Sequence, residues 1–178
     1  RKRQVGAQLL RFSKKQMTEF LTERSSKINY YTQKNFKNTE SANTMNQKAN
    51  YKVMIVDDEL PALTNMQYVL ANHPQWQLVA SCHSTAQARA ILQQESVDLL
   101  LLDIEMPTQS GIDFARELCR TSNPPLIVFI TAYNKHAVTA FEVFALDYLL
   151  KPYDDERFAA MLARAEHSLQ LKQQLAQN

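Results

Sequence analysis

Four short apolar runs in the second part of the chain each end at polar residues, and this repetition constrains the fold more than any other feature. The runs are YKVMIV before Asp57 and Asp58, VDLLLL before Asp103, LIVFI before Thr131, and DYLL before Lys151. Nearly continuous apolar runs of this length are typical of parallel strands buried on both faces. Because ligands bind beyond the carboxyl ends of such strands, the sequence predicts that these polar residues share one crevice.

Helical patterns alternate with the strand-like runs from residue 51 onward. The alternation predicts right-handed βαβ units and an α/β fold, a doubly wound five-stranded parallel sheet with helices on both faces. The expected strands are residues 52–56, 76–80, 97–102, 126–130 and 148–150. The expected helices are residues 61–71, about 84–94, a helix opening at Gly111, a helix near 136–144, and a last helix from about 154.

Charge divides the chain into two parts of opposite sign. Residues 1–50 hold 11 Lys/Arg and 3 Asp/Glu, a net charge of +8, whereas residues 51–178 hold 9 and 15, a net charge of −6. The first part has a modest helical pattern and then a polar composition, so we expect a basic N-terminal extension, partly helical and then linker-like. A basic arm for nucleic acid or an anionic membrane, and a native start at Met45, are alternatives. Residues 173–178 are expected to be a helix end or tail.

Several classes of protein are disfavoured by composition. No apolar run approaches the length of a membrane-spanning helix, and the basic start lacks the apolar core of a secretory signal, so we expect a cytoplasmic protein without membrane insertion. The two cysteines form no CxxC motif and the four histidines show no metal-ligand spacing. Any bound metal should therefore be a hard, oxygen-preferring ion. With only two glycines, the chain also lacks a phosphate-cradling nucleotide loop.

Five motif positions, taken together, resemble the receiver domain of two-component response regulators over about residues 51–172. The motifs are VDDE at Val56–Glu59, DIEMP at Asp103–Pro107 with Gly111 behind it, TA at Thr131–Ala132, and KP at Lys151–Pro152. The segment AFEVFALDYLLKP at Ala140–Pro152 further resembles receivers of LytTR-type transcriptional regulators. The resemblance implies a flavodoxin-like sheet with strand order 2-1-3-4-5.

The same resemblance implies a phosphoacceptor site that uses Mg²⁺. Asp103 would accept a phosphoryl group from a sensor histidine kinase, as a carboxylate nucleophile. Asp58 and Asp103 would bind Mg²⁺ directly, Asp57 largely through water, and Glu105 through its backbone carbonyl. Such a chain is not an enzyme in the ordinary sense, since it promotes its own phosphorylation and dephosphorylation.

Further residues are implied in binding the phosphoryl group and in switching. Lys151 would pair with one phosphoryl oxygen, while the Thr131 hydroxyl and the Ala132 amide would donate to others. A cis peptide is implied between Lys151 and Pro152. Thr131 and the aromatic Tyr148 would move on phosphorylation and alter the surface of helix 4, strand 5 and helix 5.

This switch surface would comprise residues 138–144, Tyr148 and the early turns of the last helix, and it would mediate homodimerisation. The LytTR resemblance also implies that DNA is bound only through an output domain that this sequence does not contain, so the sequence is either a truncated chain or a stand-alone receiver. Glu142 and Asp147 are interpreted as surface or turn residues without a role.

Two other interpretations remain from the sequence. A haloacid-dehalogenase phosphatase would also use a strand-end aspartate and Mg²⁺, together with a second acid two residues later as acid/base catalyst. That position is Glu105 within DIEMP, but the paired acids Asp57 and Asp58 after the first strand fit a receiver better. A stand-alone or degenerate receiver could act as a protein-interaction scaffold. Intact Asp57, Asp58, Asp103, Thr131 and Lys151 argue against degeneracy, and phosphate uptake separates the scaffold from the working receiver.

Overall fold

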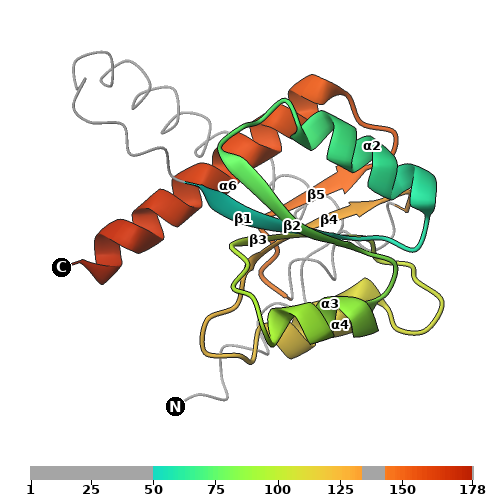
Figure 1. Ribbon diagram of the computed structural model, residues 1–178, viewed down its shortest axis with the longest axis horizontal. Helices are drawn as coiled ribbons and strands as arrows, with labels where there is room; N and C mark the ends of the chain where they lie inside the picture. Colours follow the sequence, from blue (N-terminus) through green and yellow to red (C-terminus); the bar gives the residue numbers. More distant parts are fainter. Residues whose placement is uncertain (1–49, 134–142, 178) are drawn as a thin grey trace, which may run out of the picture. The chain divides into compact units, whose positions relative to one another are not determined.

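A computed structural model describes residues 50–133 and 143–177 of the chain, and these form an all-parallel, five-stranded sheet (Figure 1). The strand order is β2-β1-β3-β4-β5, which confirms the predicted fold class. The strands are β1 (Tyr51–Val56), β2 (Trp76–Cys82), β3 (Leu99–Leu102), β4 (Leu126–Thr131) and β5 (Asp147–Leu150). The N-terminal extension and most of the helix expected near 136–144 lie outside the described residues.

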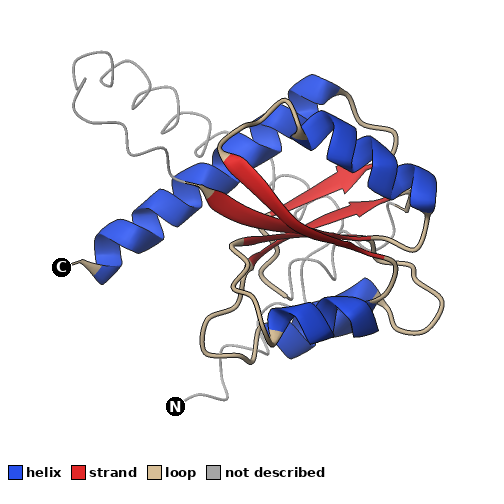
Figure 2. Ribbon diagram, in the orientation of Figure 1, coloured by secondary structure: helices blue, strands red, loops and turns tan. Residues whose placement is uncertain are grey.

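Two helical layers cover the sheet (Figure 2). In Figure 1, α2 (Leu60–Leu70) and α6 (Asp155–Ala176) lie on one side of the sheet, and α3 (Thr85–Leu92) and α4 (Gly111–Leu118) lie on the other. The predicted helices at these four places are confirmed. The division expected between residues 172 and 173 falls inside α6 and stays a prediction.

The apolar strands are explained by two separate cores, one on each face of the sheet. Alternate residues of β1 serve different cores: Val53 and Ile55 pack with α2 and α6, whereas Met54 and Val56 pack with α3 and α4. All four side chains are fully buried. Because successive side chains of a strand point to opposite faces, a strand covered on both faces must be apolar at nearly every position.

Local capping residues set where the helices begin. Pro61 occupies the first turn of α2, where its missing N–H costs no hydrogen bond. Ser84, Ser110 and Asp154 cap α3, α4 and α6 by accepting hydrogen bonds from backbone N–H groups of the first helical turn. The loops that precede these three helices follow β2, β3 and β5, so they lie at the carboxyl ends of the strands.

The turn before β5 contains an unusual residue. Phe144 has a φ of 54°, in the left-handed region, and its side chain is 89% exposed. Residues 143 and 144, which the sequence assigned to the end of a helix, form a turn instead. Neither feature stabilises the folded protein. A left-handed backbone is strained for any residue with a Cβ, and exposure leaves the apolar ring in water.

Among the residues that the structure describes, no helix is both long and apolar enough to cross a membrane.

Candidate functional site

The predicted polar residues come together because backbone hydrogen bonds continue past the strand ends. The amide of Asp57 donates to the carbonyl of Cys82 (3.0 Å), that of Asp103 to Val56 (2.9 Å), and that of Lys151 to Thr131 (2.9 Å). The first residues after β1, β3 and β5 are therefore aligned with the ends of their neighbouring strands. This alignment brings side chains from distant parts of the sequence together at the carboxyl ends of the strands.

Three carboxylates form a cluster at this end of the sheet. One carboxylate oxygen from each of Asp57, Asp58 and Asp103 lies within 4.8 Å of the others. Asp57 and Asp103 are buried, while Asp58 is half-buried. Oxygen ligands at this spacing suit a hard divalent cation such as Mg²⁺, which needs few protein carboxylates because it keeps several water ligands. The donor set therefore fits Mg²⁺.

Both carboxylate oxygens of Asp57 already have hydrogen-bond partners. The Oδ1 atom accepts from the Glu59 amide at 2.9 Å, and Oδ2 accepts from Lys151 Nζ at 2.6 Å. The Asp57 side chain has no exposed surface and that of Lys151 is 18% exposed, so the ion pair is shielded from water. The Glu59 carboxylate lies 3.8 Å from the same ammonium, but it is mostly exposed. The Lys151–Pro152 peptide is cis, as predicted.

The ammonium of Lys151 experiences opposing effects. Burial lowers its pKa, but the hydrogen bond to Asp57 and the charges of Asp103, Asp57 and Glu59 raise it, and the net direction is upward. Lys151 therefore stays protonated at neutral pH and supplies the positive charge that three neighbouring carboxylates need.

Asp103 lies in a different electrostatic setting. Burial raises the pKa of its carboxyl group; the Lys151 charge lowers it, the Asp57 charge raises it, and hydrogen bonds from the Ile104 amide (2.8 Å) and the Thr131 hydroxyl lower it. Burial dominates, and the pKa is raised overall. Thr131 is itself fully buried at the end of β4, and its Oγ1 atom accepts from the Tyr133 amide at 3.5 Å.

The loop from Asp103 to Gly111 passes unusually close to itself. The Gly111 amide donates to the Ile104 carbonyl at 2.8 Å, and a Cβ at Gly111 would lie 2.0 Å from the backbone oxygen of Asp103. Only glycine leaves room for that approach. The sequence predicts Gly111 as the start of a helix but gives no sign that this position also sets the backbone of Asp103. The same loop carries Glu105, which is half-buried.

Tyr148, one of the two residues expected to act in switching, contacts the segment that follows the other, Thr131. The hydroxyl of Tyr148 donates to the backbone carbonyl of Tyr133, two residues after Thr131. The Tyr148 ring is half-buried and tilted against Phe129, with the ring centroids 6.5 Å apart. Tyr148 is thus in contact with the segment that leaves the site through Thr131 and Ala132.

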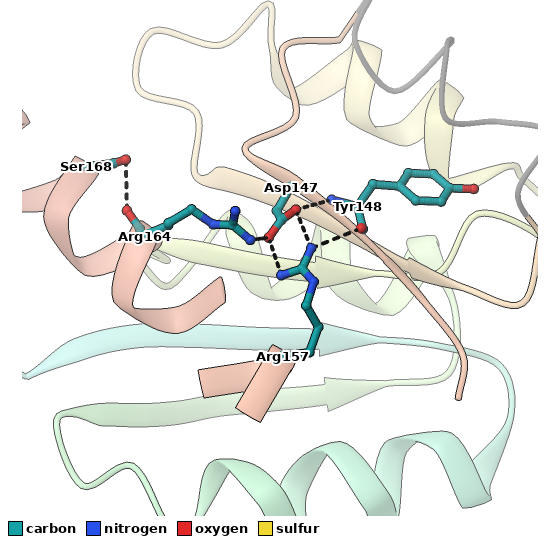
Figure 3. A network of polar contacts seen from close by, with 5 residues as sticks. All are labelled: Asp147, Tyr148, Arg157, Arg164 and Ser168. Carbon is teal, nitrogen blue, oxygen red and sulfur yellow. Dashed lines mark hydrogen bonds and ion pairs between the residues drawn. The ribbon is translucent and has the colours of Figure 1, made fainter. Parts of the chain in front are cut away.

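Asp147 was interpreted from the sequence as a residue without a role, but it joins β5 to α6. Its carboxylate accepts two hydrogen bonds from Arg157, at 2.9 and 2.8 Å, and one from Arg164 (Figure 3). Arg157 also donates to the Tyr148 carbonyl at 3.4 Å. In Figure 3 the Tyr148 ring points away from this cluster. No local signal in the sequence identifies these partners, because they are brought together only by the packing of α6.

These features define a doubly wound α/β domain with a buried, partly charge-compensated acidic site that is compatible with Mg²⁺. The family model for the response regulator receiver domain matches residues 53–163, and the chain belongs to this family.

Known relatives agree with this assignment. The chain is 38% identical over 117 residues to sensory transduction protein LytT of Enterococcus faecalis, covering 66% of this chain and 48% of LytT. It is 38% identical over 122 residues to transcriptional regulatory protein YpdB of Escherichia coli K12, covering 68% and 50%. Both relatives are LytTR-type regulators, the group whose receivers this chain was predicted to resemble. The chain spans about half the length of these curated relatives.

Solved structures agree as well. The response regulatory domain of protein MrkE from Klebsiella pneumoniae matches with a TM-score of 0.65 and 37% identity, covering 67% of this chain and 98% of that domain. TrrA of Thermotoga maritima, solved in complex with Mg²⁺ and beryllofluoride, matches with a TM-score of 0.59 and 21% identity, covering 65% and 98%. The second likeness shows the fold alone.

Replacing Asp103 by asparagine is expected to raise the free energy of unfolding of the metal-free protein at neutral pH. The raised pKa of Asp103 means that folding favours its protonated form, so the wild type loses stability as the pH rises through that pKa. The variant has no such loss, and its advantage should vanish in acid, below the pKa of the unfolded chain. Urea denaturation of both proteins across this pH range measures the difference. An equal advantage at every pH would contradict the electrostatic explanation.

Proposed function

We propose that this chain is a phosphoacceptor receiver, in which Asp103 accepts a phosphoryl group from the phosphohistidine of a sensor kinase. The observation that carries the proposal is the acidic cluster of Asp57, Asp58 and Asp103, with Lys151 paired to Asp57, at the carboxyl ends of the strands in a receiver fold. Phosphoryl transfer depends mainly on positioning and on neutralising charge, and this site provides both.

The transfer would exchange one bond to phosphorus for another. A carboxylate oxygen of Asp103 attacks the phosphorus atom, an O–P bond forms, and the N–P bond of the phosphohistidine breaks, which returns the imidazole. The hydrogen bond from the Ile104 amide to Oδ1 holds the Asp103 carboxylate in one orientation before the reaction. Because the acceptor is the chain's own residue, the protein promotes its own phosphorylation and dephosphorylation and is not an enzyme in the ordinary sense.

The residues around Asp103 would divide the remaining roles. Bound Mg²⁺ would supply charge neutralisation for the phosphoryl oxygens, held directly by Asp58 and Asp103 and by the Glu105 carbonyl. Asp57 would act through water, and the engagement of both its oxygens by Glu59 and Lys151 supports this indirect role.

The phosphoryl oxygens would be bound by three groups from β4 and β5. Lys151 would pair with one oxygen, whereas the Thr131 hydroxyl and the Ala132 amide would donate to others. Thr131 already lies against Asp103, whose pKa its hydroxyl lowers. Thr131 and Tyr148 would then act as the switch residues, because Tyr148 is bonded to the segment that follows Thr131.

Intact mass after incubation with Mg²⁺ and a small phosphodonor tests this proposal. The wild type is expected to gain one phosphoryl group, and Asp103→Asn none. If neither protein gains mass, the interaction scaffold becomes the better account. If both gain equally, the acceptor is another residue.

The names of two relatives support a proposal about the partners of this chain. LytT is described as a sensory transduction protein and YpdB as a transcriptional regulatory protein. We therefore propose that this chain works in the cytoplasm with a histidine kinase, and that it acts on DNA only through an output domain outside this sequence. Transfer of label from a phosphorylated kinase to the wild type, but not to Asp103→Asn, is the expected result for a cognate pair.

The same proposal includes phosphorylation-promoted homodimerisation through the switch surface, which comprises residues 138–144, Tyr148 of β5 and the early turns of α6. Phe144 lies in the part of this surface that the structure describes. Its ring is exposed to solvent and its backbone is strained, which supports a role for this ring in contact with a partner. Beryllofluoride with Mg²⁺ is expected to convert the wild type from monomer to dimer in sedimentation velocity. An unchanged mass at a fully occupied site would rule out this dimer.

Phe144→Gly is the informative variant for this surface, because it removes the whole aromatic side chain and glycine adopts a φ of 54° without strain. It is expected to fold with unchanged or greater stability and to remain a monomer with beryllofluoride. Dimerisation equal to that of the wild type would show that the ring takes no part.

A further inference from the structure

Arg89 of α3 makes a set of contacts that the roles described above leave unused. Its Nε and Nη2 atoms each donate to the Glu117 carboxylate of α4, both at 2.7 Å. The Nη2 atom also donates to Oε1 of Gln109 at 3.0 Å. The guanidinium lies over the ring of Phe114, with Cζ 5.3 Å from the ring centroid. One side chain therefore joins α3, α4 and the loop between β3 and α4.

The loop that Arg89 reaches is the one that begins at the phosphoacceptor. It runs from Asp103 to Gly111, carries Glu105, and includes Gln109 near its far end. Its near end is fixed by backbone contacts, since the Asp103 amide donates to Val56 and the Gly111 amide to Ile104. The position of the segment between these contacts depends on its side chains, and Gln109 ties that segment to a neighbouring helix.

The geometry of the Arg89 contacts favours a fixed orientation rather than a loose surface pair. A guanidinium that donates two parallel hydrogen bonds to one carboxylate is held in a plane, and the Phe114 ring beneath it is fully buried. The hydrogen bond with Glu117 raises the pKa of Arg89, and the same bond lowers that of Glu117. The Arg89 side chain is 37% exposed, so we assign it an orienting role and no large contribution to global stability.

We propose that Arg89 is a positioning residue, which acts through Gln109 to hold the Asp103–Gly111 loop so that the Glu105 carbonyl is in place for Mg²⁺. This inference rests on the proposed function, in which Glu105 binds the metal. Groups that orient metal ligands from behind typically change metal affinity by about 10–100-fold when they are lost. We expect the lower end of that range, because only one backbone ligand is affected.

Two variants and one matched control test the role. Arg89→Met keeps the aliphatic packing on Phe114 but removes the hydrogen bonds. Gln109→Leu releases the loop and leaves the Arg89–Glu117 pair intact. Lys52→Met is the control, because it breaks the Lys52–Glu95 pair, which is similarly exposed and stands in the first half of β1, away from the site.

The first readout needs no metal and no phosphate. In the metal-free proteins, amide hydrogen exchange between residues 104 and 111 is expected to be faster in Arg89→Met and Gln109→Leu than in the wild type or Lys52→Met. The second readout is the Mg²⁺ dissociation constant from titration calorimetry, which is expected to rise about tenfold in both loop variants. The rate of phosphate uptake should fall at limiting Mg²⁺ and recover at saturating Mg²⁺.

The outcomes separate this inference from the proposed function. A wild type that takes up no phosphate contradicts the proposed function, whatever the exchange data show. The role of Arg89 is overturned if the wild type takes up phosphate but both loop variants match Lys52→Met in amide exchange rate and in Mg²⁺ affinity. If Arg89→Met does not fold, Gln109→Leu decides alone. A loss of stability with unchanged Mg²⁺ affinity would assign Arg89 a structural role only and would also overturn the inference.

Discussion

Replacing Lys151 by methionine is expected to lower the free energy of unfolding by about 3 kcal/mol or more and to abolish measurable phosphate uptake. The Asp57 carboxylate has no exposed surface and accepts a 2.6 Å hydrogen bond from Lys151, so the variant leaves a buried charge without its partner. Removing one member of a buried ion pair typically costs about 3–5 kcal/mol. The two other carboxylates of the cluster, Asp58 and Asp103, add repulsion that the lysine no longer offsets.

The pH range of this effect follows from the direction of the Lys151 pKa. Because the pKa is raised in the folded protein, the stabilisation is fully present below the pKa of an unfolded lysine and is lost only as the pH rises through the folded value. The destabilisation of Lys151→Met should therefore persist throughout the neutral range. Urea denaturation of both proteins measures it, and saturating Mg²⁺ should restore part of the loss.

A double variant provides the control. Asp57→Asn combined with Lys151→Met removes both charges, so it should be more stable than Lys151→Met alone, although it takes up no phosphate. This result would separate the unpaired charge from lost packing of the lysine stem. A loss below about 1 kcal/mol for Lys151→Met would show that water or cations already screen Asp57, contrary to its burial.

Replacing Gly111 by alanine is expected to be nearly as damaging at the site, through sterics rather than charge. The new Cβ would lie 2.0 Å from the Asp103 carbonyl oxygen, which belongs to the backbone and has no rotamer that avoids the clash. The loop must shift by more than about 1 Å to restore a normal contact. Misplacement on that scale costs on the order of 100-fold in rates that depend on positioning.

Phosphate uptake and thermal unfolding of Gly111→Ala measure the two parts of this effect. Ser110→Ala is the matched control: it removes the side-chain cap on the Ile112 amide, at a cost of about 1 kcal/mol, but leaves the space beside Asp103 unchanged. Uptake by Ser110→Ala should stay close to that of the wild type. If Gly111→Ala takes up phosphate as fast as the wild type, the loop can relax without moving Asp103.

The sheet and the position of the site could be predicted from the sequence because both depend on local patterns. Burial on two faces requires apolar residues throughout β1, β3 and β4, and the residues that follow them then stand out. The strand boundaries were less accurate. Strand β2 extends to Cys82 rather than residue 80, because Ser81 and Cys82 still pair with Ile55 and Val56, and β3 begins at Leu99 rather than residue 97.

The partners of the site residues could not be predicted, because they depend on tertiary contacts. The sequence indicates that Lys151 belongs to the site, but not that Asp57 holds it. Likewise, the pairing of Asp147 with two arginines of α6, and the contact of Arg89 with Gln109, join segments with no shared pattern. The close approach of Gly111 to Asp103 is a backbone event that residue type alone does not reveal.

In the proposed receiver, the ion pair between Asp57 and Lys151 would couple Mg²⁺ binding to the position of the lysine. A divalent cation that draws on the Asp57 carboxylate weakens its attraction for the ammonium, and a lysine that stays close reduces the charge available to the cation. The two cations would therefore compete for the Asp57 carboxylate, and each would lower the other's apparent affinity. An incoming phosphoryl group would add negative charge, so that both cations could be bound at the same time. Metal and phosphoryl group should thus bind cooperatively, with Lys151 as the group that makes each depend on the other.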